Sequence, residues 1–202
     1  MWKEQIQYCL EQDEKYLKNM TFEIQTIENN NLTKFDFQNI VFDSCTFINC
    51  DFSECCFTDC EIINCHFYDC CFARTYLKQT NIIDSIYSKG SVFIEAHMKK
   101  SNLKQCSFAY ANFSNTFWEK CNVEKCNMKY AFFHNVIFKN IKLEYVNFQK
   151  ADFFKTILKS IDFSNCDIQA ITVSDTFQEL KGMKISAEQA ISVAQILEME
   201  IL

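Results

Sequence analysis

The chain has 202 residues, enough for one domain with a substantial core or for two small ones. It contains no Pro, two Gly, 21 Phe and 13 Cys, and its 49% of hydrophobic residues excludes a disordered chain. The formal net charge is −6, and no stretch approaches the roughly 18 apolar residues of a membrane-spanning helix. Because the charged start lacks the apolar region of a signal peptide, and the Cys count is odd, we expect a cytoplasmic protein without a disulfide framework.

Residues 1–21 have the pattern of an amphipathic capping segment, which we expect to be helical. Apolar residues recur at helical spacing, with Glu, Gln and Lys between them. The last of these apolar residues also fits the period of the segment that follows, so it could begin the first repeat. The residues in question are Trp2, Ile6, Cys9, Leu10 and Leu17.

A period of five residues runs through residues 22–173. Stepping by five from Phe22 to Tyr87 and, after a shift of one residue, from Phe93 to Val173 meets an apolar side chain at all 31 positions. We call these positions the centres, and we expect them to point inward, so that a charge at any centre is poorly tolerated. The predicted structural core is taken from the centres: Phe47, Phe52, Phe57, Phe67, Phe108, Phe113, Phe133 and Phe148.

A small residue stands two places before most centres, and the other three places of each five are mostly polar. One large and one small inward residue in every five fit neither a helix nor a plain strand. They fit a coil with one short extended segment per five residues and a corner between segments. Because the chain has two Gly, we do not expect these corners to be the usual Gly-type tight turns.

Ten of the 13 Cys occupy the small inward position, where we expect them to act as small hydrophobic residues. The alternative is a redox or metal role, because Cys residues 20 apart should lie within disulfide range in neighbouring coils. No C-x-x-C pair is present, which argues against that alternative. The stacked pairs would be Cys45 with Cys65, Cys50 with Cys70 and Cys106 with Cys126, whereas Cys56 and Cys71 should face outward.

The period of five slips by one residue at 88–92, where Gly90 lies. We interpret this slip as a bulge or kink between two stacks of repeats, because Gly adopts backbone angles that other residues avoid.

The run CTFINCDFSECCFTDCEIINCHFYDC resembles the pentapeptide-repeat family, whose repeat is A/C-D/N-L/F-x-x. That resemblance implies a right-handed quadrilateral β-helix in which four repeats make a 20-residue coil and coils stack about 4.8 Å apart. We therefore predict an all-β solenoid of about eight coils over residues 22–178. An N-terminal capping segment (1–21) precedes it, and a C-terminal helix and tail (179–202) follow.

The C-terminal segment LKGMKISAEQAISVAQILEMEIL contains a capping box, Ser186-x-x-Gln189, followed by an apolar stripe. It resembles the C-terminus of the Qnr and MfpA group within the family, as the stretch AYANFSNTFWEKCNVEKC resembles a mid-chain segment of Qnr proteins. Glu198 stands where that group has a Gly after the helix. The matching residues are Leu180, Gly182, Met183, Gln189, Ala190 and Leu197.

The resemblance of this segment implies a tail-to-tail homodimer. The alternative interpretation is that the helix only caps its own coil. We favour the dimer, because the apolar stripe and the tail otherwise leave much apolar surface at one end. The predicted interface comprises Ala190, Val193, Ala194, Leu197 and Ile201.

Catalytic constellations are missing from the sequence. His66, His97 and His134 stand beside centres at outward positions and lie in different coils. Two Gly cannot form a Gly-rich phosphate loop. We therefore expect no enzyme activity, no catalytic or cofactor-binding residue, no cofactor and no metal.

Charge is unevenly distributed along the chain. Residues 35–73 have seven acidic residues and no Lys or Arg, residues 160–202 have a net charge of −5, and residues 89–159 have a net charge of +7. The acidic residues of the first segment are Asp36, Asp43, Asp51, Glu54, Asp59, Glu61 and Asp69. Every coil of the face marked by Met98, Trp118, Phe138 and Leu158 presents Lys, which predicts a basic ladder or a merely solvated face. The ladder residues are Lys99, Lys100, Lys120, Lys139 and Lys159.

The resemblance to the Qnr and MfpA group implies a homodimeric protein that imitates DNA and binds a type II topoisomerase, DNA gyrase or topoisomerase IV. It would protect that enzyme from quinolones or gyrase-directed toxins, with the acidic residues of 35–73 doing the imitation. The alternative is an adaptor or scaffold that binds another protein, or a nucleic acid, through its acidic or Lys-rich faces. We expect no membrane partner and do not expect direct nucleic-acid binding.

Overall fold

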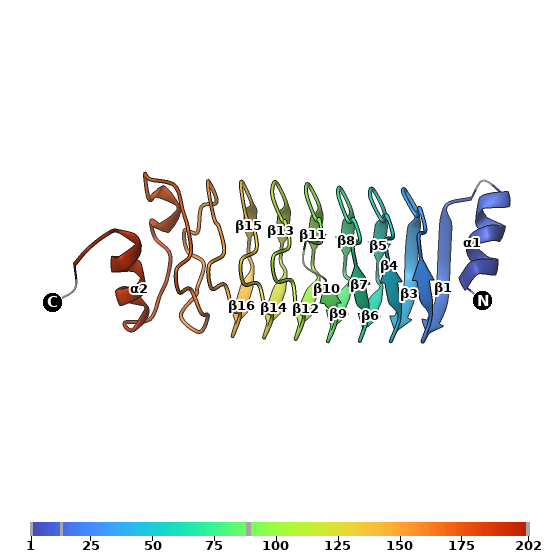
Figure 1. The fold of residues 1–202 in the computed structure, drawn as a ribbon, viewed down its shortest axis with the longest axis horizontal. Coiled ribbons are helices and arrows are strands. Elements are labelled where there is room, and N and C mark those ends of the chain that lie inside the picture. Colours follow the sequence, from blue (N-terminus) through green and yellow to red (C-terminus); the bar gives the residue numbers. More distant parts are fainter. Residues whose placement is uncertain (1, 13, 88–89, 201–202) are drawn as a thin grey trace.

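The computed structural model describes residues 2–12, 14–87 and 90–200, which wind into a parallel β-solenoid (Figure 1). Helix α1 (Trp2–Glu11) lies at one end of the rod and helix α2 (Gln189–Ile196) at the other. The predicted all-β solenoid with a C-terminal helix is confirmed. Within the described residues, neither helix has the length and apolar character needed to cross a bilayer.

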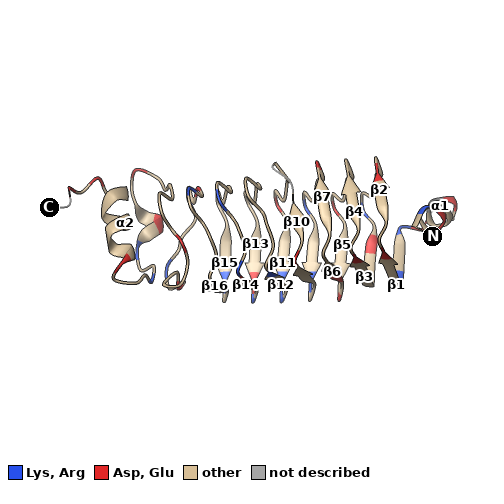
Figure 2. Cartoon of the chain, turned by 60° about the horizontal axis from the view of Figure 1, so that its bottom comes forward, with Lys and Arg blue, Asp and Glu red and all other residues tan. Residues whose placement is uncertain are grey.

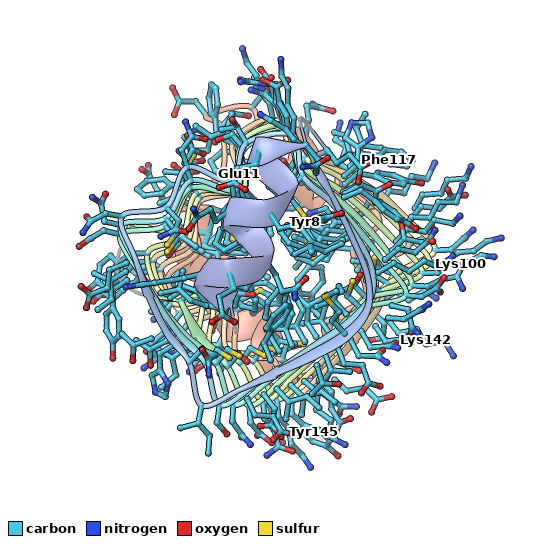
Figure 3. All side chains as sticks on the ribbon, turned by 90° about the vertical axis from the view of Figure 1, so that its right-hand side faces the viewer. Tyr8, Glu11, Lys100, Phe117, Lys142 and Tyr145 are labelled. Carbon is cyan, nitrogen blue, oxygen red and sulfur yellow. The ribbon has the colours of Figure 1, made fainter. Side chains whose placement is uncertain are left out.

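Seen along the rod axis, the coil has a four-sided outline (Figure 3). Strands β1 (Tyr16–Glu23) and β3 (Asp36–Asp43) each run around one corner and belong to faces 1 and 2. Isolated bridges, such as Asn112 with Phe132, form face 4. Face 1 continues with β5 (Cys56–Thr58), β8 (Tyr76–Lys78), β11 (His97–Lys99), β13 (Phe117–Glu119) and β15 (Ile137–Lys139). Face 2 continues with β6 (Glu61–Ile63), β9 (Asn81–Ile83), β12 (Asn102–Lys104), β14 (Asn122–Glu124) and β16 (Lys142–Glu144), and face 3 consists of β2 (Thr26–Glu28), β4 (Thr46–Ile48), β7 (His66–Tyr68) and β10 (Ile86–Tyr87).

The strands build about six turns, fewer than the eight or so coils that the repeat count predicts. After β16 the repeats continue, but they pair through single bridges, such as Asp152 with Thr172, rather than through strands. A 3₁₀ turn, η1 (Gln178–Leu180), then leads toward α2. The number of turns is therefore lower than the predicted number of coils because the last repeats do not pair as regular strands.

The register between neighbouring coils is 20 residues before the slip and 21 across it. Phe37 pairs with Phe57, whereas Leu77 pairs with Met98. After the slip, Met98 pairs with Trp118 and the spacing of 20 returns. One extra residue is therefore inserted near Gly90, which adopts a φ of 91°. Residues 88–89 of the predicted slip lie outside the described part of the chain.

The centres fill the axis of the rod. The eight predicted core Phe residues are all at most 2% exposed. Their rings stack in columns from coil to coil, as between Phe47 and Phe67, whose centroids lie 4.9 Å apart with an interplanar angle of 3°. Burial of each such ring contributes about 1.5–3 kcal/mol, so the columns are the main source of stability.

The small inward residue also donates a hydrogen bond, which the sequence analysis missed. The Cys45 thiol donates to the backbone oxygen of Phe22 at 3.2 Å, and the Thr80 hydroxyl donates to that of Phe57 at 2.9 Å. Both acceptors are centres of the preceding coil. Cys, Ser and Thr therefore fit this position by size and by donor capacity, and burial raises the pKa of the Cys60 thiol to about 11.

The corners use residues other than Gly in the left-handed region, two places after nearly every centre. Asn39 has a φ of 54° and Glu54 a φ of 61°. Asn tolerates this conformation best among the residues with a side chain. The Asn39 side chain also donates to the Asn19 side-chain oxygen at 2.8 Å, so the corner residues bond from coil to coil.

Both ends of the rod are covered. Trp2 of α1 is 2% exposed and packs edge-on against Phe22, with ring centroids 5.0 Å apart. The predicted capping box is present at α2, because the Gln189 N–H donates to the Ser186 Oγ at 3.3 Å and the Ser186 N–H donates to the Gln189 Oε1 at 2.8 Å. Glu198 takes the left-handed conformation, with a φ of 56°, that Gly would otherwise supply after the helix.

The corner residue Ile24 should limit stability. It has a φ of 51° and is 82% exposed, so its β-branched side chain strains the backbone and packs against little. We expect Ile24→Asn to raise the free energy of unfolding by about 1 kcal/mol, measured by urea unfolding followed by circular dichroism. The control is Ile86→Asn on β10, where the backbone is extended and no gain is expected. An unchanged or lower stability of Ile24→Asn contradicts the strain argument.

Stability should also depend on pH through Glu179, which is 1% exposed. Burial raises the pKa of this carboxyl, but hydrogen bonds from the Ser174 hydroxyl and from the N–H groups of Lys155 and Ser174 outweigh it and hold the pKa below the usual 4.5. The ionised form is therefore favoured in the folded state, and its contribution is present above pH 4.5 and lost as the pH falls below it. Glu179→Gln should destabilise the protein at pH 7, and the difference from wild type should shrink at pH 4. A difference that is independent of pH contradicts this assignment.

Candidate interaction surfaces

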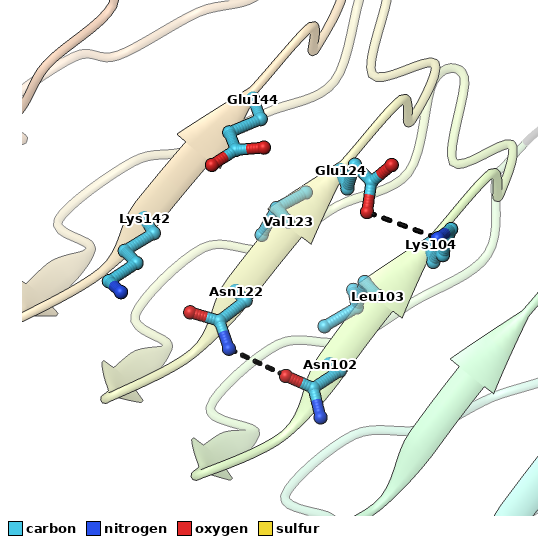
Figure 4. A pocket seen from close by; sticks show the side chains of 8 residues that line it. All are labelled: Asn102, Leu103, Lys104, Asn122, Val123, Glu124, Lys142 and Glu144. Carbon is cyan, nitrogen blue, oxygen red and sulfur yellow. Dashed lines mark hydrogen bonds and ion pairs between the residues drawn. The ribbon is translucent and has the colours of Figure 1, made fainter.

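One depression on the described part of the chain lies on face 2 and has a volume of about 370 Å³ (Figure 4). Four of its polar side chains are paired with one another, since Lys104 binds Glu124 at 3.3 Å and the Asn122 side-chain N–H donates to the Asn102 side-chain oxygen at 2.7 Å. Hydrogen bonds from Lys125 and Lys104 lower the pKa of Glu124. Among the described residues, no group of three or more His, Cys, Asp or Glu is arranged to hold a metal ion. The candidate sites are therefore surfaces rather than pockets.

The predicted acidic residues are distributed over different faces and corners of the rod, on which Figure 2 draws Asp and Glu in red. Glu54 is neutralised, because Arg74 binds it at 3.0 Å and Lys34 lies 3.8 Å away, and the bond to Arg74 is the main cause of its lowered pKa. By register, Asp36 lies on face 1, Asp43 and Glu61 on face 2 and Asp51 on face 4. Asp59, Asp69 and Glu54 occupy the corners that follow faces 1, 3 and 4.

The basic ladder lies on face 1, but an acid that the sequence analysis overlooked divides it. Glu119 lies in the same column as Lys99 and Lys139 and pairs with both, at 3.1 and 3.5 Å. The bond from Lys99 is the main cause of the lowered pKa of Glu119. The spacing of 20 residues from Lys99 to Glu119 to Lys139 could have revealed this pairing in advance. Lys100 and Lys120 occupy corners, and Lys159 continues the column by its position in the repeat.

A column of outward, mostly apolar side chains lies on the same face, one residue before each centre, and was also missed. Tyr76 and Phe117 in it are half-buried, and its other members are exposed. Phe117 projects from the same side of the rod as Lys100 (Figure 3). Ile137 and Ile157 are 60% and 56% exposed. The signal was again the spacing of 20 or 21 residues. We call this set the apolar column; it consists of Tyr76, His97, Phe117, Ile137 and Ile157.

The predicted dimer residues do not all face the same way. Val193 is half-buried against the core with Ile196, and the Gln189 side-chain N–H donates to the Phe163 and Cys166 backbone oxygens at 2.9 and 2.6 Å. Helix α2 therefore caps its own coil through this side. Ala190 is exposed, Ala194 and Leu197 are half-exposed, and Ile201 lies outside the described residues.

The other sequence candidates remain apart from these surfaces. His66 and His97 lie on faces 3 and 1, and His134 lies 2.8 Å from Asp152 on face 4. The inward Cys residues are buried thiols without disulfides, whereas Cys56 and Cys71 are half-buried at the surface.

Comparison with known proteins follows from this fold. Among curated proteins, none matches the chain. The solved structure of HetL, a pentapeptide-repeat protein from Nostoc sp. strain PCC 7120, has 12% identity and a TM-score of 0.49, over 89% of this chain and 92% of that one. The full-length structure of QnrB1, a plasmid-mediated fluoroquinolone resistance protein, has 19% identity and a TM-score of 0.48, over 88% of this chain and 98% of that one. The family model for pentapeptide repeats matches in eight copies at residues 27–59, 89–122, 106–144 and 138–169. With more than half of its length matched and a coil of four five-residue repeats, the chain belongs to the pentapeptide-repeat family.

Proposed function

We propose that this chain is a cytoplasmic, non-catalytic protein whose acidic coils occupy the DNA-binding surface of a type II topoisomerase, DNA gyrase or topoisomerase IV. Its effect would be to protect that enzyme from quinolones or gyrase-directed toxins. Two features support the proposal. One is the resemblance of the C-terminal sequence to the Qnr and MfpA group, and the other is the density of negative charge on residues 35–73.

The charge density is the observation that carries the proposal. Residues 35–73 form about two coils and so span roughly 10 Å of the rod, at about 4.8 Å per coil. With Glu54 neutralised, six acidic residues remain, or one charge per roughly 1.6 Å of axis. Duplex DNA has one charge per about 1.7 Å. On this part of the rod, a protein surface built to bind duplex DNA would therefore find a number of negative charges per unit length similar to that of DNA.

The distribution of the acids around the rod fits the same partner. The phosphates of a duplex wind around it, so a DNA-binding cleft contacts negative charge from more than one side. A single acidic strip would imitate only one side of a duplex. Asp36, Asp43 and Asp51 lie on three different faces and Asp69 lies at the corner after face 3, so two walls of a cleft could each contact acids.

The basic part of the rod limits how the protein would enter such a cleft. Residues 89–159 have a net charge of +7, which a DNA-binding surface repels. The acidic coils near α1 would therefore enter the cleft, and the basic coils would stay outside it. This orientation leaves α2, at the opposite end of the rod, free for a second copy of the chain (Figure 1).

We propose that the second copy binds the outer side of α2. Val193 and Ile196 are already used against the chain's own core. Ile191 and Met199 remain 56% and 59% exposed, and exposed apolar side chains gathered at one end favour association.

The topoisomerase proposal predicts binding that depends on the acidic coils. The isosteric variant Asp36→Asn/Asp43→Asn/Asp59→Asn/Glu61→Gln should bind purified gyrase at least tenfold more weakly than wild type. In a supercoiling assay with ciprofloxacin, wild type should restore activity and the variant should not. Both measurements follow from the loss of four negative charges that would face cationic side chains.

The matched control removes four acids near the other end, Asp167→Asn/Asp175→Asn/Glu188→Gln/Glu200→Gln, and should bind as wild type does. The proposal fails if wild type binds neither gyrase nor topoisomerase IV. It also fails if the two quadruple variants bind equally well, since net charge alone would then explain the effect.

The dimer proposal predicts a mass twice the 23.9 kDa of the chain in size-exclusion chromatography with light scattering. Ile191→Asp/Met199→Asp should shift the protein to the monomer, because the charges would be buried in the interface. Ile24→Asp, at the other end, should leave the mass unchanged. A monomeric wild type at about 100 μM would show that α2 only caps its own coil.

A further inference from the structure

The apolar column and the basic ladder form one continuous surface on face 1. Strand pairing places Tyr76, His97, Phe117 and Ile137 one above the other, and Ile157 follows 20 residues later in the repeat. The ladder lies two places further along each strand, on the same side of the sheet. Because coils rise by about 4.8 Å, the column extends for roughly 20 Å. Face 1 thus presents a hydrophobic stripe beside a line of cations.

The charge on this surface is positive and only partly compensated. On the described face 1 strands from β8 to β15, Glu119 is the one outward acid, and Lys99 and Lys139 already pair with it. Glu95 lies at the corner that precedes β11. Lys100, Lys120 and Lys159 form no ion pair with another described residue. A partner that supplied carboxylates would therefore meet unpaired cations along the whole stripe.

The apolar column is exposed most strongly where it contains aliphatic side chains. Ile137 and Ile157 are both more than half exposed, whereas the adjacent centres Phe138 and Leu158 are half-buried and buried. Two exposed Ile side chains one coil apart leave apolar surface in contact with water. Covering that surface with a partner's apolar side chains would be favourable. The stripe therefore favours a partner that has apolar side chains as well as acids.

A nucleic acid fits this surface less well than a protein segment does. Base stacking needs open aromatic ring faces, but His97 contacts Tyr76 on one side and Phe117 on the other, with ring centroids 6.4 and 5.9 Å apart. The two most exposed members of the column are aliphatic and cannot stack bases.

We propose that face 1 between Tyr76 and Lys159 binds an acidic protein segment that has apolar side chains and lies along the rod. Its carboxylates pair with Lys100, Lys120 and Lys159, and its apolar side chains cover Ile137 and Ile157. This surface begins at β8, directly beyond β5 of the acidic coils, and has the opposite charge, so its partner is different from the one proposed for residues 35–73.

The experiment uses a random 16-residue peptide library displayed on phage and selected on the full-length protein. Selected peptides are then synthesised with a fluorescent label, and their affinity is measured by fluorescence anisotropy. We expect enrichment of peptides rich in Asp, Glu and apolar residues. Lys100→Glu/Lys120→Glu and Ile137→Ser/Ile157→Ser should each weaken binding at least tenfold, because one removes the cations and the other the apolar contact. Added salt should weaken binding to the wild type.

The matched controls have the same changes on other faces. Lys129→Glu/Lys142→Glu and Ile24→Ser/Ile86→Ser should change the affinity less than twofold, and circular dichroism should show every variant folded. The proposal is wrong if no acidic, apolar peptides are enriched or if such peptides bind the face 1 variants as tightly as wild type. The proposal is also wrong if a 20-nucleotide oligo-dT, or vesicles with phosphatidylserine, bind the wild type but neither face 1 variant, whereas the peptides still bind both variants.

Discussion

The backbone of each coil finds most of its hydrogen-bond partners in the coils before and after it. The coil around Asn127 is typical. The Asn127 N–H donates to the Cys106 oxygen at 2.8 Å and its oxygen accepts from the Phe108 N–H at 2.7 Å, both in the coil before, while the adjacent Cys126 oxygen accepts from the Asn147 N–H at 2.9 Å in the coil after. The coils must therefore have equal length and equal outline. An inward side chain and a left-handed corner in every five residues meet that requirement, and the extra residue near Gly90 is absorbed in one place without disturbing the coils on either side. Because of this regularity, equivalent outward side chains of successive coils form columns with a spacing of about 4.8 Å.

Much of this fold could be predicted from the sequence because its strongest pattern has the same period as its structure. The centres, the small inward position and the Ser186–Gln189 capping box are local patterns, and the structure has all three. The carbonyl acceptors of Cys45 and Thr80 could not be found in this way, because they lie 23 residues back along the chain. The corners show a similar limit, since side chains as different as those of Lys34, Tyr110 and Ile24 adopt the same backbone conformation there.

The candidate sites were harder to predict because they depend on columns rather than on runs of sequence. The acids of residues 35–73 are neighbours in the sequence, but consecutive acids on the chain lie on different faces and corners of the coil. The converse holds for Glu119, which is 20 residues from each of its Lys partners and adjacent to both in space. In a solenoid, charges must be read at the interval of a whole coil before they can be assigned to one surface.

These columns divide the rod into regions with different chemistry. Negative charge surrounds the coils near α1, face 1 of the later coils combines cations with exposed Ile, and α2 closes the far end while leaving apolar side chains on its outer side. Such a rod can contact separate partners with separate regions, because neighbouring coils interact only with each other. The topoisomerase, second-copy and acidic-segment proposals use three different regions, so the failure of one leaves the others standing.

Thermal unfolding of two internal deletions tests the equal-coil requirement most directly. Deletion of residues 108–127 removes one complete coil in the 20-residue register that joins Ser107 to Asn127. Deletion of residues 108–129 removes two residues more and so leaves the next coil too short to close. The first variant should unfold in one cooperative transition with a Tm within about 5 °C of wild type, and the second should lose far more stability. Equal losses in the two variants, or failure of only the first to fold, would contradict a structure built from equal coils.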